Sequence, residues 1–360
     1  MRRHAMATMK DVTETTPLAP SEPETQLASR RPRWSDYTAF VFSSGGARGA
    51  LQVGALRALY EHGERPDVVV GTSIGSWNGA MVARNPMPDV IEELTRVWRG
   101  LTTSRVLLDW EPRFTQVAPA FTGAFVVAAM RRVTMGMSSL YGDSGLRHIL
   151  AEHLSDARFE EMRVPFRVMA ANLTTGGISV FGQGPIEMAL LASSAIPGIF
   201  PPVRINGHTF VDGGALESAS IDTAIALGAR RIFVLDAGYD ATPEADELLQ
   251  RLITHDGRGN QQPNAHALAV MLERTATMMG RYQLQRAVER VPPGVEAHII
   301  RPTNTMGDAT LDFDHAANWI DAAYEHAREY LREHVAPLPH AAQPDGDTVR
   351  SDSEMEQRAG

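Results

Sequence analysis

The first part of the chain alternates short apolar runs with segments whose apolar residues recur every three or four positions. The runs Thr38–Phe42 and Asp67–Val70 are typical of buried β-strands, and each leads into a glycine-containing turn. The segments that follow the turns, Leu51–Leu59 and Trp77–Ala83, have the spacing of helices. This order of strand, glycine turn and helix, met twice, predicts a right-handed crossover unit with a parallel sheet.

The rest of the pattern continues the same architecture. Further strands are predicted at Phe166–Ala171, Ile178–Phe181, Thr209–Val211, Arg231–Leu235 and His298–Arg301. The segment Asp312–His334 has apolar residues at helical spacing and predicts one long amphipathic helix. With no internal repeat, these elements indicate a single α/β domain with a mostly parallel central sheet flanked by helices.

The two ends lack this periodicity. Residues 1–35 contain a proline-rich stretch, Thr13–Glu24, and residues 336–360 are acidic, so both are predicted to be disordered tails around a folded body at 36–335. No apolar segment follows Arg2 and Arg3, and the most apolar stretch, Val117–Met130, falls short of the ~20 residues of a membrane span. We expect a cytoplasmic protein with no transmembrane helix, and association with a membrane surface stays open.

Composition removes several kinds of chemistry. The 360 residues include no cysteine, which excludes disulfides, thiolate nucleophiles and cysteine-bound metals. The one lysine, Lys10, falls in the predicted tail, so neither a Schiff base nor a Walker-type phosphate site is expected. The formal net charge of −9 argues against a nucleic-acid partner. Hydroxyl, carboxylate, imidazole and backbone amide groups remain, and no cofactor or metal is expected.

The second glycine turn carries a candidate nucleophile. It reads Gly71-Thr72-Ser73-Ile74-Gly75 and stands between the run Asp67–Val70 and a predicted helix. Glycines on both sides of a serine at a strand-to-helix turn let the hydroxyl project from the sheet edge. The N–H of Ile74 opens the helix and points where an oxyanion would form. The pattern predicts Ser73 as a nucleophile, with Gly71 and Gly75 shaping its turn.

The first glycine turn, Ser44-Gly45-Gly46-Ala47-Arg48-Gly49, follows the neighbouring strand. Successive N–H groups in such a turn can form a nest for an anion. A dinucleotide fingerprint would need a glycine where Ala47 stands, and a Walker loop would need a lysine. An oxyanion hole that faces Ser73 fits better, and a tight turn without any ligand is the alternative.

Two residues compete for the role of the base. Asp212 ends the strand Thr209–Val211, and the two glycines that follow it, Gly213 and Gly214, allow a close approach. Among the twelve histidines, His208 is the best candidate because it stands in the turn before the same strand. A strand-end aspartate is more often a simple turn former, so these residues alone leave both candidates open.

Together, the ordered motifs resemble the patatin-like phospholipase family. The motifs are Gly46-Ala47-Arg48-Gly49, Gly71–Gly75, the block Ala192–Pro202 and Asp212-Gly213-Gly214. The family loop often begins with three glycines, and Ser44 stands at the first of these positions here. The resemblance covers about residues 37–335. It implies Ser73 as nucleophile, Asp212 as its base in a two-residue dyad, and oxyanion donors within Gly45–Gly49.

The resemblance also implies hydrolysis of a fatty acyl ester at a lipid or membrane surface. An acyltransferase or thioesterase with the same dyad, or a catalytically weak lipid-binding module, is the alternative. The apolar region Phe114–Met137 is expected to line or cover the acyl groove. Arg48 would order its loop, attract an anionic headgroup or form a surface salt bridge. The segment Ala265–Val288 fits either homo-oligomerisation or packing on the sheet.

Overall fold

The computed structural model of the protein describes residues 37–107, 138–238, 265–301 and 311–336. Residues 1–35, the region Phe114–Met137 and all of the C-terminal tail except Ala336 lie outside the described residues. None of the helices in the described ranges is both long enough and apolar enough to cross a bilayer.

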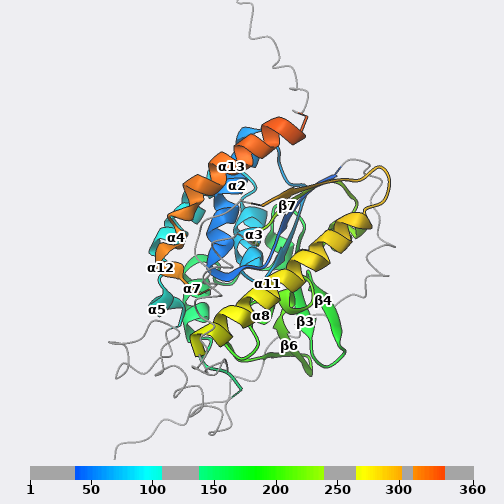
Figure 1. Cartoon of the computed structure of the whole chain (residues 1–360). Helices are drawn as coiled ribbons and strands as arrows, with labels where there is room; N and C mark the ends of the chain where they lie inside the picture. The colour runs from blue at the N-terminus through cyan, green and yellow to red at the C-terminus, as the bar shows by residue number, and fades with distance from the viewer. Residues whose placement is uncertain (1–36, 108–137, 239–264, 302–310, 337–360) are drawn as a thin grey trace, which may run out of the picture.

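A single sheet forms the centre of the molecule (Figure 1). In the described part of the chain it has eight strands: β1 (Tyr37–Phe42), β2 (Val68–Thr72), β3 (Phe166–Asn172), β4 (Gly177–Phe181), β5 (Val203–Ile205), β6 (His208–Asp212), β7 (Ala229–Leu235) and β8 (Glu296–Ile300). The strand order is β5-β6-β3-β2-β1-β7-β8, with β4 paired to β3. The neighbours β3, β2, β1, β7 and β8 are parallel, whereas β4 and β6 run antiparallel to β3, and β5 antiparallel to β6. This confirms the α/β class with a mostly parallel sheet.

Helices cover both faces of the sheet. They are α2 (Gly49–Glu61), α3 (Ile74–Arg84), α4 (Val90–Gly100), α5 (Thr103–Val106), α7 (Ser144–His153), α8 (Glu187–Ser193), α9 (Ile221–Ala226), α11 (Ala265–Glu289), α12 (Phe313–Ala316) and α13 (Trp319–His334). Short 3-10 turns stand at η2 (Gly46–Arg48), η3 (Phe159–Glu161) and η4 (Gly213–Ala215).

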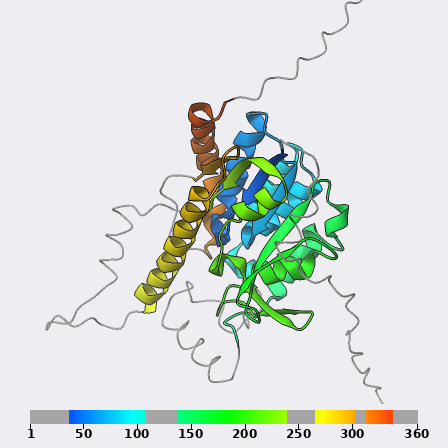
Figure 2. The same ribbon diagram turned by 90° about the vertical axis from the view of Figure 1, so that its right-hand side faces the viewer.

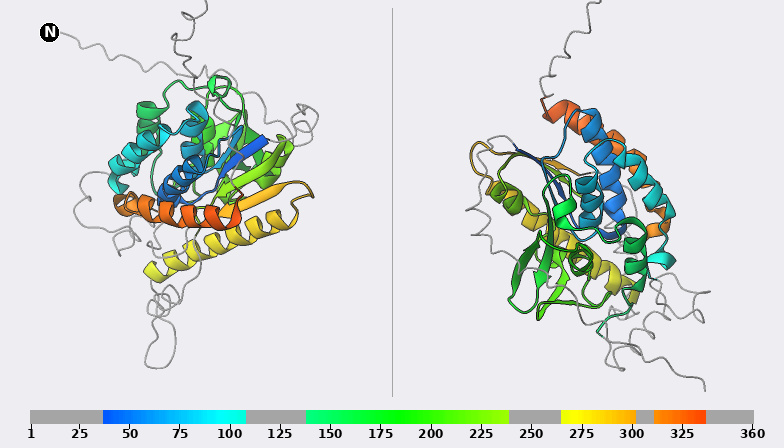
Figure 3. Two further views of the ribbon diagram at one scale, coloured as in Figure 1. Left: turned by 90° about the horizontal axis from the view of Figure 1, so that it is seen from above. Right: turned by 180° about the vertical axis from the view of Figure 1, so that it is seen from behind.

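The two faces of β1 show how the core is divided. Phe40 and Phe42 point into the larger apolar core, which α2, α3 and α13 complete. The alternate residues, Ala39 and Val41, point into a smaller core with α9 and α11, as the two-residue period of a strand requires. Figure 2 shows α11 (yellow) along one side of the molecule, and the right-hand view in Figure 3 shows α13 (orange) beside α2 (blue).

The register of β3 brings two distant segments together. One edge of β3 pairs with β2 up to Met169, whose partner is Thr72. The next residue, Ala170, pairs with Asp212 at the end of the antiparallel strand β6. The last residues of β2 and β6 therefore meet end to end along β3, although they are far apart in the sequence. The turn after Thr72 begins beside Asp212.

The predicted strands are present, but the single long helix at Asp312–His334 was wrong. The chain forms α12 and then α13, with a break at Ala317 and Asn318. Phe313 of α12 stacks on the Trp98 ring, with centroids 6.2 Å apart, while α13 lies along α2. At Gly54 of α2 an added Cβ would stand 2.1 Å from a carbonyl oxygen of α13. Packing across the molecule thus sets two helix directions that one straight helix could not satisfy.

Candidate active site

Ser73 stands in a strained turn between β2 and α3. Its φ of 54° and ψ of −130° are unusual for a residue with a side chain, and such strain is typical of functional positions. A Cβ at Gly71 would lie 2.5 Å from the Ser76 Cα, and one at Gly75 would lie 2.4 Å from the carbonyl oxygens of Phe42 and Ser43. Both positions therefore admit only glycine without movement of the backbone, as the sequence pattern suggested.

The hydroxyl of Ser73 points directly at Asp212. Ser73 Oγ donates to Asp212 Oδ2 at 2.5 Å, and the N–H of Gly214 donates to the other carboxylate oxygen at 2.7 Å. The side chains of Ser73 and Asp212 are both buried. A Cβ at Gly213 would lie 2.6 Å from the Met169 carbonyl oxygen, so this glycine lets the aspartate loop sit close against β3. The structure thus brings the two residues of the predicted dyad into direct contact.

Burial changes the acidity of this carboxyl group. It raises the pKa of Asp212 to about 6, although the hydrogen bonds from Ser73 and from the Gly214 N–H act in the opposite direction by stabilising the carboxylate. Among the described residues, no cation contributes to this shift. At neutral pH Asp212 is still mostly ionised, and it is a stronger base than an exposed aspartate.

His208 lies elsewhere. It begins β6, four residues before Asp212, and its Nδ1 is 3.2 Å from the side-chain nitrogen of Asn172. Four residues of strand correspond to about 13 Å, so His208 lies at one end of β6 and the Ser73 hydroxyl lies beside the other. Geometry therefore favours Asp212 over His208 as the group that accepts the serine proton.

The glycine-rich loop after β1 is fixed from two sides. Arg48 is only 4% exposed, and its Nε donates to the Ala237 carbonyl oxygen at 3.0 Å. In return the Ala237 N–H donates to Ser43 Oγ at 2.7 Å, and a Cβ at Gly45 would lie 2.6 Å from the Ala237 Cβ. The interpretation that Arg48 lies at the surface was wrong, because its side chain is buried. Its guanidinium orders the loop against the segment after β7.

The loop uses some of its own N–H groups. The Arg48 N–H donates to the Gly45 carbonyl oxygen, and the Gly49 N–H donates to the carbonyl oxygens of Gly46 and Ala47. Gly46 has a φ of 57°, a conformation that favours glycine, and it begins the one-turn helix η2. Helical geometry leaves the first N–H groups of a helix without partners inside it. Of the predicted oxyanion donors, Arg48 and Gly49 are therefore already engaged within the loop.

A buried polar network holds this loop to the nucleophile helix, and sequence reasoning missed it. Asn78 of α3 donates to the Gly49 carbonyl oxygen and to Gln52 Oε1, both at 2.9 Å, and accepts from Trp98 Nε1 at 3.0 Å. Gln52 Nε2 donates to the Ser43 carbonyl oxygen at 2.8 Å. The available signal was the amide side chain, Gln52 or Asn78, among the apolar residues of each predicted helix. The network keeps the oxyanion loop and the serine turn at a fixed separation.

Two further serines support the site from α8 and its end. The Ser193 hydroxyl accepts from the Ser73 N–H at 2.7 Å and donates to the Met169 carbonyl oxygen at 2.6 Å. Ser194 accepts from Trp77 Nε1 at 2.7 Å. The pair belongs to the block Ala192–Pro202, to which the sequence alone assigned no role. Ser193 connects the serine turn to the strand that also carries the partner of Asp212.

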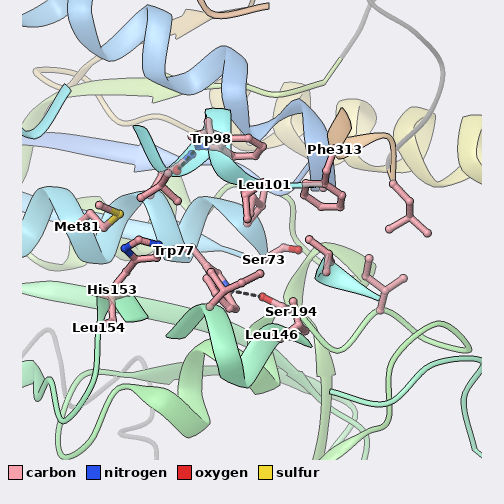
Figure 4. Close-up of a pocket in the computed structure, with 18 of the residues that line it drawn as sticks. Ser73, Trp77, Met81, Trp98, Leu101, Leu146, His153, Leu154, Ser194 and Phe313 are labelled. Atoms are coloured by element: carbon pink, nitrogen blue, oxygen red, sulfur yellow. Dashed lines mark hydrogen bonds between the residues drawn. The ribbon is translucent and has the colours of Figure 1, made fainter. Parts of the chain in front are cut away.

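An apolar pocket opens at Ser73 (Figure 4). It encloses about 750 Å³, counted to include the open space at its mouth. Besides Ser73, its lining includes Gly46, Ile74, Trp77, Asn78, Met81, Val97, Trp98, Leu101, Val106, Leu146, Ile149, His153, Leu154, Ser194, Ile196, Phe200, Leu311 and Phe313. Burial lowers the pKa of His153, which favours its neutral form. In Figure 4, His153 and Met81 lie at one side of the pocket, away from Ser73, which lies nearer the middle of the drawn side chains.

The model of the family "Patatin-like phospholipase" matches residues 40–225, and the chain belongs to this family. It is 27% identical over 202 residues to patatin-like phospholipase domain-containing protein 7 of Rattus norvegicus, a match to 56% of this chain and 13% of the relative. It is 28% identical over 309 residues to lysophospholipase nte1 of Aspergillus niger, covering 83% and 18% of the two chains. The chain thus spans less than a fifth of these curated relatives.

Among solved structures, VipD from Legionella pneumophila superposes with a TM-score of 0.42 and 14% identity. That match covers 83% of this chain and 67% of VipD.

Proposed function

We propose that the protein is a serine acyl hydrolase that cleaves fatty acyl esters of lipids through an acyl-enzyme on Ser73. The observation that carries the proposal is the 2.5 Å hydrogen bond from the Ser73 hydroxyl to the buried Asp212 carboxylate, beside an apolar pocket that Ser73 helps to line. The family name, and the name lysophospholipase of the Aspergillus niger relative, support a lipid ester as substrate.

In the first step, Ser73 Oγ attacks the acyl carbonyl carbon while its proton passes to Asp212 Oδ2. The tetrahedral intermediate then expels the alcohol, which takes the proton back from Asp212, and the acyl group stays on Ser73. Asp212 next accepts a proton from a water molecule as the water oxygen attacks the acyl carbonyl carbon. The second intermediate then breaks its bond to Ser73 Oγ, which takes the proton back from Asp212, and the fatty acid is released. A base with a pKa of about 6 suits both directions of this proton transfer.

The oxyanion would be bound by backbone N–H groups at the starts of two helices. Gly46 and Ala47 are the first residues of η2, and Ile74 is the first residue of α3. Gly46 and Ile74 also line the pocket beside Ser73. Each such donor typically lowers the barrier by about 2.7–4 kcal/mol, so the loop supplies stabilisation that a weak carboxylate base does not.

The pocket supports a long acyl chain as the group bound on the enzyme side. Its lining is almost entirely aromatic and aliphatic, so it would take apolar surface out of water at about 25 cal/mol per Å². The polar part of the lipid would then stay at the mouth with the ester bond beside Ser73. This orientation needs no charged contact inside the pocket.

The proposal is tested with a fluorescent fluorophosphonate, which reacts with activated serines. We expect labelling of the wild type, loss of labelling in Ser73→Ala, and unchanged labelling in the control Ser104→Ala, which alters an exposed serine. Hydrolysis of a dissolved short-chain ester should fall at least ~10³-fold in Ser73→Ala. Equal labelling of the wild type and Ser73→Ala would remove Ser73 as the nucleophile.

A further inference from the structure

A group of exposed apolar side chains lies on α11, outside the active site. Met271, Met278, Met279 and Tyr282 are 47%, 69%, 52% and 65% exposed, respectively. Met271, Met278 and Tyr282 are spaced by seven and four residues, which places them in one stripe along the helix. The opposite side of α11 packs through Leu284 and Ala287 into the smaller core. We call these four residues the α11 stripe.

The α11 stripe stands near the catalytic edge of the sheet. A Cβ at Gly280 would lie 3.2 Å from Ser218 Cβ, so α11 touches the chain at this residue. Ser218 in turn binds Ser44 of the glycine-rich loop through both its backbone carbonyl and its hydroxyl. Helix α11 also contacts η4, the turn that directly follows Asp212. The middle of α11 is therefore level with the loops that form the active site.

From that level, the amino-terminal half of α11 extends beyond the sheet. Met271 precedes Gly280 by nine residues, which corresponds to about 13 Å along a helix. Figure 2 shows this end of α11 standing away from the body of the molecule. Leu216, which follows η4 and is 43% exposed, adds a further apolar side chain beside the active-site turn. The stripe is thus a projecting ridge rather than a groove.

The size of the ridge favours a lipid surface over a second copy of the chain. At roughly 200 Å² per large side chain, the four exposed fractions amount to about 450 Å². A stable dimer typically buries about 800 Å² of accessible surface on each partner, and the two surfaces are complementary in shape. A patch of this size is within the range of the largest apolar patch on a typical soluble monomer, and such patches are often functional. Methionine and tyrosine are side chains that adapt to an apolar–water boundary.

We infer that the α11 stripe docks the protein on the surface of a lipid bilayer, with the catalytic edge turned toward it. The inference rests on the proposed lipid substrate, because such esters are presented in bilayers. Docking at α11 would place the mouth of the Ser73 pocket within reach of lipids without any membrane span. Because the ridge is apolar, the binding depends on apolar burial and only weakly on salt.

The test measures binding separately from catalysis. All variants carry Ser73→Ala, so that vesicles stay intact, and binding to phosphatidylcholine vesicles is followed by flotation. We expect Met278→Gln/Tyr282→Ser to weaken binding about tenfold or more. The control Met87→Gln, which alters a 50% exposed methionine between α3 and α4, should bind as the parent does. Met87 follows the carboxyl end of α3 and so lies at the opposite edge of the sheet.

Three results would overturn the inference. One is unchanged vesicle binding in Met278→Gln/Tyr282→Ser and also in Met271→Gln/Met279→Gln, which alters the other two residues of the stripe. The second is no vesicle binding by the parent protein. The third is a dimer, measured by light scattering, that the double variant converts to a monomer, which would make the stripe a contact between copies. Failure of the proposed function would appear differently, as absence of ester hydrolysis by the wild type with vesicle binding intact. Thermal unfolding of each variant checks that the exposed substitutions leave the fold unchanged.

Discussion

Replacement of Asp212 by asparagine should make the protein more stable while it removes activity. In the folded protein, burial raises the pKa of Asp212 from 3.8 to about 6. Because the pKa is higher in the folded protein, the carboxylate form of Asp212 is more stable in the unfolded chain than in the folded one. At pH 7 this linkage costs the folded state about 3 kcal/mol. Asparagine has no charge to bury, so Asp212→Asn should raise the free energy of unfolding by up to that amount.

The pH dependence of this gain follows from the sign of the shift. The folded state holds its proton at higher pH than the unfolded state, so the cost is fully present above pH 6 and disappears as the pH falls toward 3.8. The advantage of Asp212→Asn should therefore shrink from about 3 kcal/mol at pH 7 to about 0.6 kcal/mol at pH 4.

Urea unfolding of both proteins at the two pH values measures this difference. The matched control is Asp236→Asn, because Asp236 is an equally buried aspartate just after a strand, yet it accepts from Arg301 Nε at 2.6 Å. Loss of that ion pair should destabilise the protein by about 2 kcal/mol at pH 7. A fall in stability for Asp212→Asn at pH 7, or a gain that does not change with pH, would refute the reasoning.

Four other changes have defined outcomes. In the wild type, kcat/KM for a dissolved ester should fall about fivefold between pH 6 and pH 5, as Asp212 is protonated; a flat profile to pH 4.5 would assign the base elsewhere. Ser193→Ala leaves a buried N–H and a buried carbonyl without their partner, so stability should drop by about 1–3 kcal/mol and kcat at least tenfold; wild-type kcat would exclude a positioning role. Gly75→Ala should prevent folding by backbone clash, whereas Gly177→Ala, with nothing within 4 Å of its Cβ, should fold normally; a folded Gly75→Ala would contradict the tight turn. Met81→Trp should fill the far side of the pocket and raise the preference for short over long acyl esters about tenfold; an unchanged preference would place the acyl chain elsewhere.

The parts of the site that the sequence predicted are those with local causes. The serine turn is set by Gly71 and Gly75, and both show their reason within a few residues, where a Cβ would strike the backbone. The strands β1 and β2 are mostly apolar, because both of their faces are buried. Asp212 was one of two open candidates on residues alone. The register of β3, which the sequence does not display, is what separates it from His208.

The parts that could not be predicted depend on contacts between distant segments. The hydrogen bonds of Asn78 join α2, α3 and α4, and the sequence of a single helix does not show which groups this amide would meet. Arginine is usually a surface residue, and Arg48 is buried where the chain returns at Ala237, whose carbonyl oxygen accepts from its Nε. The break after Ala316 contains no glycine or proline, and Asn318 is the one residue in it that is common at helix ends. The disordered tails, the role of Phe114–Met137 and the oligomeric state remain predictions.

The central claim is that Ser73 carries the acyl group during turnover. The most direct measurement is rapid acid quenching of the enzyme with a long-chain ester, followed by mass spectrometry of the peptide that contains Ser73. The account predicts the mass of the fatty acyl group on Ser73 in the wild type and none in Asp212→Asn. An acyl group found on a different residue, or an unmodified Ser73 peptide when a burst of alcohol release has already occurred, would contradict it.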